Sequence, residues 1–280
     1  MLLRTFPPLP ELAHLLMHIL VVELDQIDSH IPAAISPSIM CFIKGRASLL
    51  QPDGTPLEAP DFFLFGPFKH AIRTRYSAGT VCISVCFRPG ILHQASGIYP
   101  DKIVDQAVPL EDLFDKAQIL LFRQRLSSCD SVEEQVAAFQ QLMQQILNLK
   151  KRSGMGEAFL RAQNKLFFPL ADMSSFFGIG QRQLERRVVE AFGMPIRDVR
   201  RFSRYGYSML HMIANPTSRG DLTHIAQEFG YYDQAHMHRD YIELTGTPPS
   251  LLLQKMASDD PAYWLYRIPP EAFKNLFFAV

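Results

Sequence analysis

The sequence predicts an α+β protein: a β-rich N-terminal domain followed by an all-helical domain with two helix-turn-helix units. Large apolar residues alternate in short runs between Ser38 and Phe87, helical periodicity begins after Pro109, and the C-terminal half contains an internal repeat. Because 48% of the 280 residues are hydrophobic, the chain can bury two cores. We expect domains at residues 1–152 and 158–256 and an aromatic tail at residues 257–280.

The N-terminal half is expected to form a small sheet or barrel. Val81–Phe87 places a large apolar side chain at every second position, which is typical of a half-buried strand. The turn signal Gln51-Pro-Asp-Gly54 separates the run Phe42–Leu50 from a second run that ends at Leu57. We therefore expect a hairpin there.

A long amphipathic helix is predicted at the end of this domain. Ser131-Val-Glu-Glu134 is a capping box, and the apolar residues after it share one stripe. They are Val132, Val136, Phe139, Met143, Ile146 and Leu149. Several glutamines and few like charges would suit a helix that meets a second copy of the chain. Alternatively, the stripe covers the core of its own domain.

Charge divides between the two predicted domains. Residues 1–149 carry 11 basic and 15 acidic side chains, a balance of −4, whereas residues 150–256 carry 15 and 10, a balance of +5. The basic, glycine-containing stretch Lys150–Gly156 is the expected linker. Polyanion binding needs segregated positive charge, but +5 is equally common on a solvated helical surface, so charge alone decides little.

An internal repeat follows the linker. At an offset of 53 residues, Leu184, Arg186, Val188, Gly193 and Pro195 match Met237, Arg239, Tyr241, Gly246 and Pro248. Each copy supplies a short helix, a glycine that can take a positive φ in the turn, and a second amphipathic helix. Asp221 and Asp233 can cap the helices of the second copy, Gly180 can cap the second helix of the first, and Ile196–Ala214 would connect the units. Such a pair can place two helices in successive major grooves of DNA, about 34 Å apart.

The second helix of each unit carries side chains suited to base recognition. Arg182 and Arg186 share one face, and a guanidinium can donate two hydrogen bonds to guanine. Glu185 can accept from cytosine N4, and Gln234 can read adenine. Other arginines are assigned to DNA phosphates or to ion pairs with Glu190 and Asp198. These are Arg187, Arg197, Arg200, Arg201 and Arg204. Any one of them taken alone is more often a solvated surface residue.

Two stretches resemble the AraC/XylS family of regulators. They are Gly178-Ile-Gly-Gln-Arg-Gln-Leu-Glu-Arg-Arg187 with Phe192-Gly-Met-Pro195, and Ile225–Arg239 with Gly246-Thr-Pro248. The resemblance covers residues 158–256. It implies a sequence-specific regulator of transcription that binds double-stranded DNA, with RNA polymerase as a further expected partner, and without a metal. The chain is also expected to be cytoplasmic and to lack a cofactor and enzyme activity, because the sequence shows no membrane span, secretory signal or catalytic motif. The resemblance places DNA contacts at Gln181, Arg182, Glu185, Arg186, Gln234, His236, His238 and Arg239.

The N-terminal half resembles a sensor-type domain of this family through Phe65-Gly-Pro67, Phe87-Arg-Pro-Gly90 and Asp105–Phe114. This likeness implies a cupin-like or jelly-roll-like fold that binds a small effector or forms a homodimer. An apolar effector pocket is expected at Phe62, Phe63, Phe65 and Phe68, although phenylalanines in a sheet are more often core. The alternative function is an effector-independent DNA-binding regulator whose N-terminal domain only dimerises.

Other kinds of site have little support in the sequence. The four cysteines lack the spacing of a metal site or a disulfide framework and are expected to be reduced, mostly buried thiols. Histidines of the strand region occur singly, and no catalytic or phosphate-binding motif is present. The apolar stretch Leu12–Leu24 is too short for a membrane span. The aromatic tail is expected to pack on one of the domains or on a second subunit.

Overall fold

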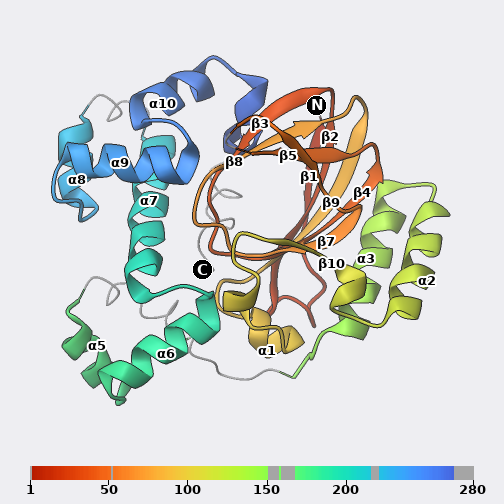
Figure 1. Cartoon of the computed structure of the whole chain (residues 1–280), viewed down its shortest axis with the longest axis horizontal. Coiled ribbons are helices and arrows are strands. Elements are labelled where there is room, and N and C mark those ends of the chain that lie inside the picture. The colour runs from red at the N-terminus through yellow and green to blue at the C-terminus, as the bar shows by residue number, and fades with distance from the viewer. Residues whose placement is uncertain (1, 52, 151–157, 159–167, 216–220, 268–280) are drawn as a thin grey trace.

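The computed structural model of the chain is a two-sheet β-sandwich with helices on both sides (Figure 1). The structure describes every residue except 1, 52, 151–157, 159–167, 216–220 and 268–280. Two helices, α2 (Lys116–Ser127) and α3 (Val132–Ile146), cover one side of the sandwich, and the helices after residue 168 lie on the other. The predicted α+β fold with a β-rich N-terminal part is confirmed. Most of the expected linker lies outside the described residues.

The sandwich consists of two antiparallel sheets. In spatial order the larger sheet contains β1 (Leu2–Phe6), β2 (Leu16–Leu24), β9 (Thr80–Phe87), β4 (Ser38–Lys44), β7 (Phe62–Phe65) and β10 (Ala107–Pro109). The smaller sheet contains β3 (Ile27–Ile31), β8 (Ile72–Tyr76), β5 (Ala47–Leu50) and β6 (Pro56–Glu58). Short helices follow β9 at α1 (Leu92–Ser96), η1 (Pro100–Lys102) and η2 (Leu110–Asp112).

The predicted strand at Val81–Phe87 forms, but its expected half-burial is wrong. Ile83 and Val85 face the core beneath α2 and α3, while Cys82 faces the smaller sheet. Both faces of β9 are buried because helices cover the outer side of its sheet.

The predicted hairpin is confirmed as β5 and β6, closed by the Gln51 N–H, which donates to the Thr55 carbonyl at 2.9 Å. The run Phe42–Leu50 is nevertheless not one strand. Gly45, at φ 69°, turns the chain so that β4 and β5 enter different sheets.

Helix α3 begins at its predicted capping box. The Ser131 hydroxyl accepts from the Glu134 N–H at 3.2 Å, and the Glu134 carboxylate accepts from the Asp130 N–H. Its apolar stripe packs on its own chain: Val136, Phe139 and Met143 are buried in the core beneath the larger sheet. The structure therefore contradicts an intermolecular role for this stripe.

The helical part contains the two predicted helix-turn-helix units, drawn at opposite ends of α7 in Figure 1. The units are α5 (Leu170–Phe177) with α6 (Gln181–Phe192), and α8 (Leu222–Glu228) with α9 (Gln234–Thr245). The predicted connector is α7 (Ile196–Ala214), and α10 (Pro249–Ala257) and η5 (Pro261–Arg267) follow the second unit. The turn glycines Gly178 and Gly230 have φ of 65° and 77°, as predicted. No helix in the described part of the chain is long and apolar enough to cross a membrane.

Both helix-turn-helix units contact the sandwich. At the end of α9, the Leu244 carbonyl accepts from the Ala33 N–H at 2.7 Å, and the Glu243 carbonyl accepts from the Ala71 N–H at 2.9 Å. At the end of α6, Gly193 lies against Pro100 of η1. The second helix of each unit is thus held at its C-terminal end by the β-rich part.

Candidate functional site

Helix α6 presents one polar face to solvent. Leu184, Val188 and Phe192 are buried and fix the opposite face in the helical core. The exposed residues include the predicted base contacts Gln181, Arg182, Glu185 and Arg186. The structure therefore brings these four side chains onto one accessible surface of the first unit.

Helix α9 is oriented in the same manner. Met237, Tyr241 and Leu244 are buried, and the Tyr241 hydroxyl lies 2.7 Å from the Ser208 hydroxyl of α7. The Asp233 carboxylate caps the helix by accepting from the His236 N–H at 2.6 Å, as predicted. Three of the four predicted base contacts are exposed: Gln234, His238 and Arg239.

His236 is the exception among the predicted contacts. Its Nδ1 accepts from the Tyr232 N–H at 3.3 Å, and its Nε2 lies 3.8 Å from an Asp240 oxygen. Its ring also meets Tyr231 edge-on. His236 is half-buried against the turn before α9, and its role as a DNA contact stays a prediction.

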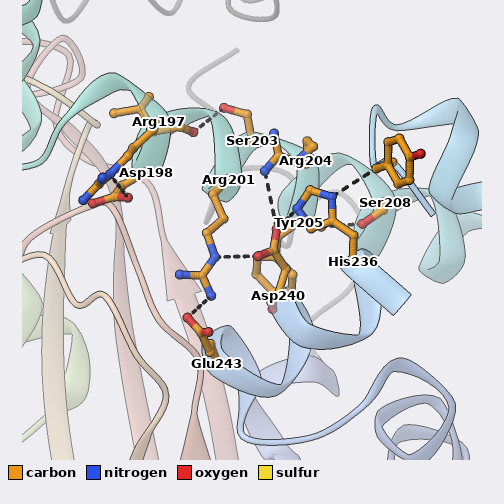
Figure 2. A network of polar contacts seen from close by, with 12 residues as sticks. Arg197, Asp198, Arg201, Ser203, Arg204, Tyr205, Ser208, His236, Asp240 and Glu243 are labelled. Atoms are coloured by element: carbon orange, nitrogen blue, oxygen red, sulfur yellow. Dashed lines mark hydrogen bonds and ion pairs between the residues drawn. The ribbon is translucent and has the colours of Figure 1, made fainter. Parts of the chain in front are cut away.

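Asp240 is the centre of a polar network between α7 and α9 (Figure 2). Its carboxylate accepts from Arg201 Nε at 2.8 Å and lies 3.5 Å from Arg204. Arg201 also binds Glu243 at 2.5 Å. The side chains of Asp240, Arg201 and Arg204 are only 11%, 19% and 17% exposed. The expectation that Arg201 and Arg204 bind phosphates is therefore corrected: both are committed to holding α9 against α7.

Some of the other arginines predicted to contact phosphates also bind groups within the protein, and others stay exposed. Arg200 donates to the Phe168 carbonyl at 2.5 Å and contacts Met173, so it fastens the start of the first unit. Arg197 is largely exposed and pairs with Asp198 at 3.5 Å, one of its expected partners. Glu190 instead lies 3.7 Å from His93 of α1. Arg187, on α6, is half-exposed and stays a predicted phosphate contact.

Tyr232 is a candidate that the sequence reasoning missed. It stands in the turn before α9 and is 90% exposed. It lies two residues before Gln234, and a tyrosine hydroxyl can donate a hydrogen bond to a DNA phosphate. The signal was present in the pair Tyr231-Tyr232, but only the structure separates the buried tyrosine from the exposed one.

A second candidate site is the cavity between the two sheets. It has a volume of about 140 Å³ and is lined mainly by apolar side chains. Phe63, Phe65 and Phe68 line it, as predicted. Phe62 does not, because alternate side chains of a strand point to opposite faces. It packs against Phe122 and Phe139 of α2 and α3 at ring distances of 5.3 and 5.6 Å, which corrects its assignment to the pocket.

The lining also contains polar groups. Burial lowers the pKa of His18, which is 6% exposed, to about 4, so this side chain is neutral at pH 7. The Ser36 hydroxyl and the Trp264 indole nitrogen are buried and make no hydrogen bond within the described part of the chain. Buried polar atoms ordinarily have a partner, and both of these residues belong to the cavity lining.

The start of the aromatic tail, η5, lies between this cavity and the helical core. Trp264 and Leu265 line the cavity, whereas Tyr263 and Tyr266 are buried in the core of the helix-turn-helix units. Tyr263 stacks on His30 of β3 at 4.6 Å, and its hydroxyl lies 3.0 Å from that of Thr247. This part of the tail therefore packs on both the sandwich and the helical part, not on one alone.

Metal-binding geometry is absent from the described residues, among which no group of three or more His, Cys, Asp or Glu side chains is placed to hold an ion. Cys41, Cys82 and Cys86 are buried free thiols, as predicted, and Cys129 is partly exposed. Burial raises the pKa of each of the three buried thiols to about 12, so they are protonated and unreactive at neutral pH.

Comparison with known proteins identifies the helical part. A helix-turn-helix domain family matches residues 173–255. No curated protein matches the sequence. Among solved structures, ToxT from Vibrio cholerae is 12% identical, with a TM-score of 0.47, over 84% of this chain and 97% of ToxT. A ToxT structure with a bound unsaturated fatty acid is 13% identical, with a TM-score of 0.43, over 84% and 94%. The AraC-like transcriptional activator CuxR is 16% identical, with a TM-score of 0.31, over 71% and 78%.

Proposed function

We propose that the chain is a DNA-binding regulator of transcription of the AraC/XylS type, and that it reads specific double-stranded DNA through α6 and α9. The observation that carries the proposal is the pair of exposed polar faces on the second helices of two tandem units. Arg182 and Arg186 on α6 and Arg239 on α9 are the expected guanine contacts. Glu185, Gln234 and His238 complete the two faces, and Gln181 lies at the start of the first.

We further propose that a small molecule in the sandwich cavity controls this binding. The support is the position of η5, because neighbouring residues of one short segment contact the cavity and the helix-turn-helix core. A molecule that moves Trp264 acts on the segment that carries Tyr263, and Tyr263 is hydrogen-bonded to Thr247, two residues after the end of α9. A ligand that binds two arrangements of this segment with different affinity shifts the balance between them.

Selection from a random pool of duplex DNA tests the first proposal. The full chain should enrich one sequence motif, and affinity for that motif should exceed affinity for scrambled DNA by about 10³-fold or more at physiological salt. Enrichment that stays at background, together with equal affinity for motif and scrambled DNA, would contradict sequence-specific binding.

The second proposal is tested by thermodynamic linkage. A true effector must change DNA affinity by the same factor by which DNA changes effector affinity, typically 5- to 150-fold. If molecules that bind in the cavity leave DNA affinity unchanged, the alternative function remains: a regulator whose DNA binding is independent of any effector.

A further inference from the structure

The cavity between the sheets is the size of one small ring. Its volume of about 140 Å³ is close to that of an engineered protein cavity of about 150 Å³ that binds benzene. A molecule of roughly six to ten non-hydrogen atoms would fill this space. The size of the cavity therefore favours a monocyclic or similarly small occupant.

The lining offers no countercharge. Among the described residues that line the cavity, none is Lys, Arg, Asp or Glu. Its one histidine, His18, is neutral, because burial lowers its pKa to about 4. Cys82 and Cys86 are protonated thiols. An anionic or cationic ligand would lose its hydration here without gaining a partner, which is strongly unfavourable.

The lining does offer hydrogen bonds. The Ser36 hydroxyl is in a residue that is 7% exposed, and the Trp264 indole nitrogen is in a residue that is 4% exposed. Neither atom has a hydrogen-bond partner in the described part of the chain. Indole N–H only donates, whereas a hydroxyl donates and accepts. A ligand with one oxygen could therefore satisfy either atom.

We propose that the cavity binds an uncharged, mainly apolar molecule about the size of one benzene ring, with one oxygen function that hydrogen-bonds to Ser36 or Trp264. This inference deepens the proposed effector control by giving the chemical class of the effector. The cavity itself does not depend on DNA binding, so the two can be tested separately.

The protein carries its own probe of occupancy. Trp264 is the single tryptophan of the chain, so all indole fluorescence comes from the wall of the cavity. We would titrate the full chain, without DNA, with benzyl alcohol, toluene and benzoate. These three share the ring and differ in having a neutral hydroxyl, no polar group and a negative charge. Benzyl alcohol should shift the emission saturably and bind at least tenfold more tightly than benzoate.

Two variants tie the signal to the cavity. Ser36→Ala removes a polar partner without filling the space, so it should weaken benzyl alcohol binding severalfold and leave toluene binding nearly unchanged. Ser127→Ala is the matched control, because that hydroxyl lies on α2, away from the cavity, and donates to the Gln124 carbonyl. Ala47→Leu adds bulk beside Trp264 in the lining and should abolish binding of all three molecules. Circular dichroism and denaturant unfolding establish that each variant is folded.

Several results would overturn the proposal. They are benzoate binding as tightly as benzyl alcohol, no saturable change in emission up to the solubility limit of benzyl alcohol, and an unchanged benzyl alcohol affinity in both Ser36→Ala and a folded Ala47→Leu. None of these results depends on DNA. If the ligand titration behaves as expected but the selection from random DNA enriches no motif, only the proposed DNA-binding function is contradicted.

Discussion

Arg201 of α7 and Asp240 of α9 form a largely buried ion pair, with Arg201 Nε 2.8 Å from Asp240 Oδ1. Asp240 directly follows His238 and Arg239, the two exposed side chains assigned to DNA. The residue that anchors the recognition helix and the residues that extend from it are thus adjacent in sequence. If α9 reads DNA as proposed, its attachment to α7 should set the angle at which the helix meets the duplex.

This anchor predicts a large loss of stability on Asp240→Leu. The substitution leaves Arg201 and Arg204 largely buried without their shared carboxylate, which should cost about 3–5 kcal/mol of the free energy of unfolding. Urea unfolding would measure it. Asp61→Ala is the matched control, because Asp61 pairs with Arg123 at a comparable 2.9 Å but in solvent, where the cost should stay below about 1 kcal/mol. Equal losses in the two variants would show that the buried pair has no special role.

A pair of glycines tests the contact between α6 and the sandwich. Gly178 and Gly193 both have positive φ, 65° and 73°, so alanine is strained at either, by about 1–2 kcal/mol. A Cβ at Gly178 would meet nothing within 4 Å, whereas one at Gly193 would lie 2.8 Å from a backbone atom of Pro100. Gly193→Ala should therefore lose more stability than Gly178→Ala. It should also accelerate proteolysis between the two parts of the chain.

The buried His18 should make the free energy of unfolding depend on pH in a specific way. Its pKa in the folded state is about 4, below the ordinary value of 6.5, so between these pH values the unfolded chain binds a proton that the folded chain does not. The contribution of His18 to the free energy of unfolding is therefore complete above about pH 6.5 and is lost as the pH falls toward 4, by about 3 kcal/mol at most. Unfolding of wild type and His18→Met should be compared across this range. If the free energies of unfolding of the two proteins change with pH in parallel, the lowered pKa of His18 is contradicted.

Arg187 tests the division between base and phosphate contacts. Arg187→Ala should weaken binding to specific and scrambled duplexes by a similar factor, and it should reduce the slope of log affinity against log salt by about 1. Fluorescence anisotropy across a salt series measures both quantities. Arg125→Ala, an exposed arginine on α2, should change neither. If Arg187→Ala weakens binding to the specific duplex alone, Arg187 contacts a base and not a phosphate.

The sequence alone predicted most of the helical part, because its signals are local. Asp221 and Asp233 cap the helices that they were expected to cap, and α7 has the predicted bounds of Ile196–Ala214. Helical periodicity and capping depend on residues a few positions apart, so they are visible without a fold.

What the sequence missed depends on contacts between distant residues. Arg201 looked like a phosphate contact because Asp240, 39 residues away, could not be placed beside it. Phe62 looked like a pocket residue because its strand could have faced either way, and Phe122 and Phe139 decide the direction. The part played by Trp264 in the cavity required the tail to be placed against the sandwich. Sheet partners and ion pairs between elements are non-local and leave no periodic signature.

The central claim is that α6 and α9 read two separate blocks of one DNA site. Selection from random duplex DNA with wild type, Arg186→Ala and Arg239→Ala tests it most directly. The wild-type motif should contain two blocks about 10 base pairs apart, centre to centre, one for each helix. Arg186→Ala should lose the preference in one block and Arg239→Ala in the other, each at a cost of about 1–3 kcal/mol. If both folded variants return the complete wild-type motif with undiminished preference, these helices do not read the DNA.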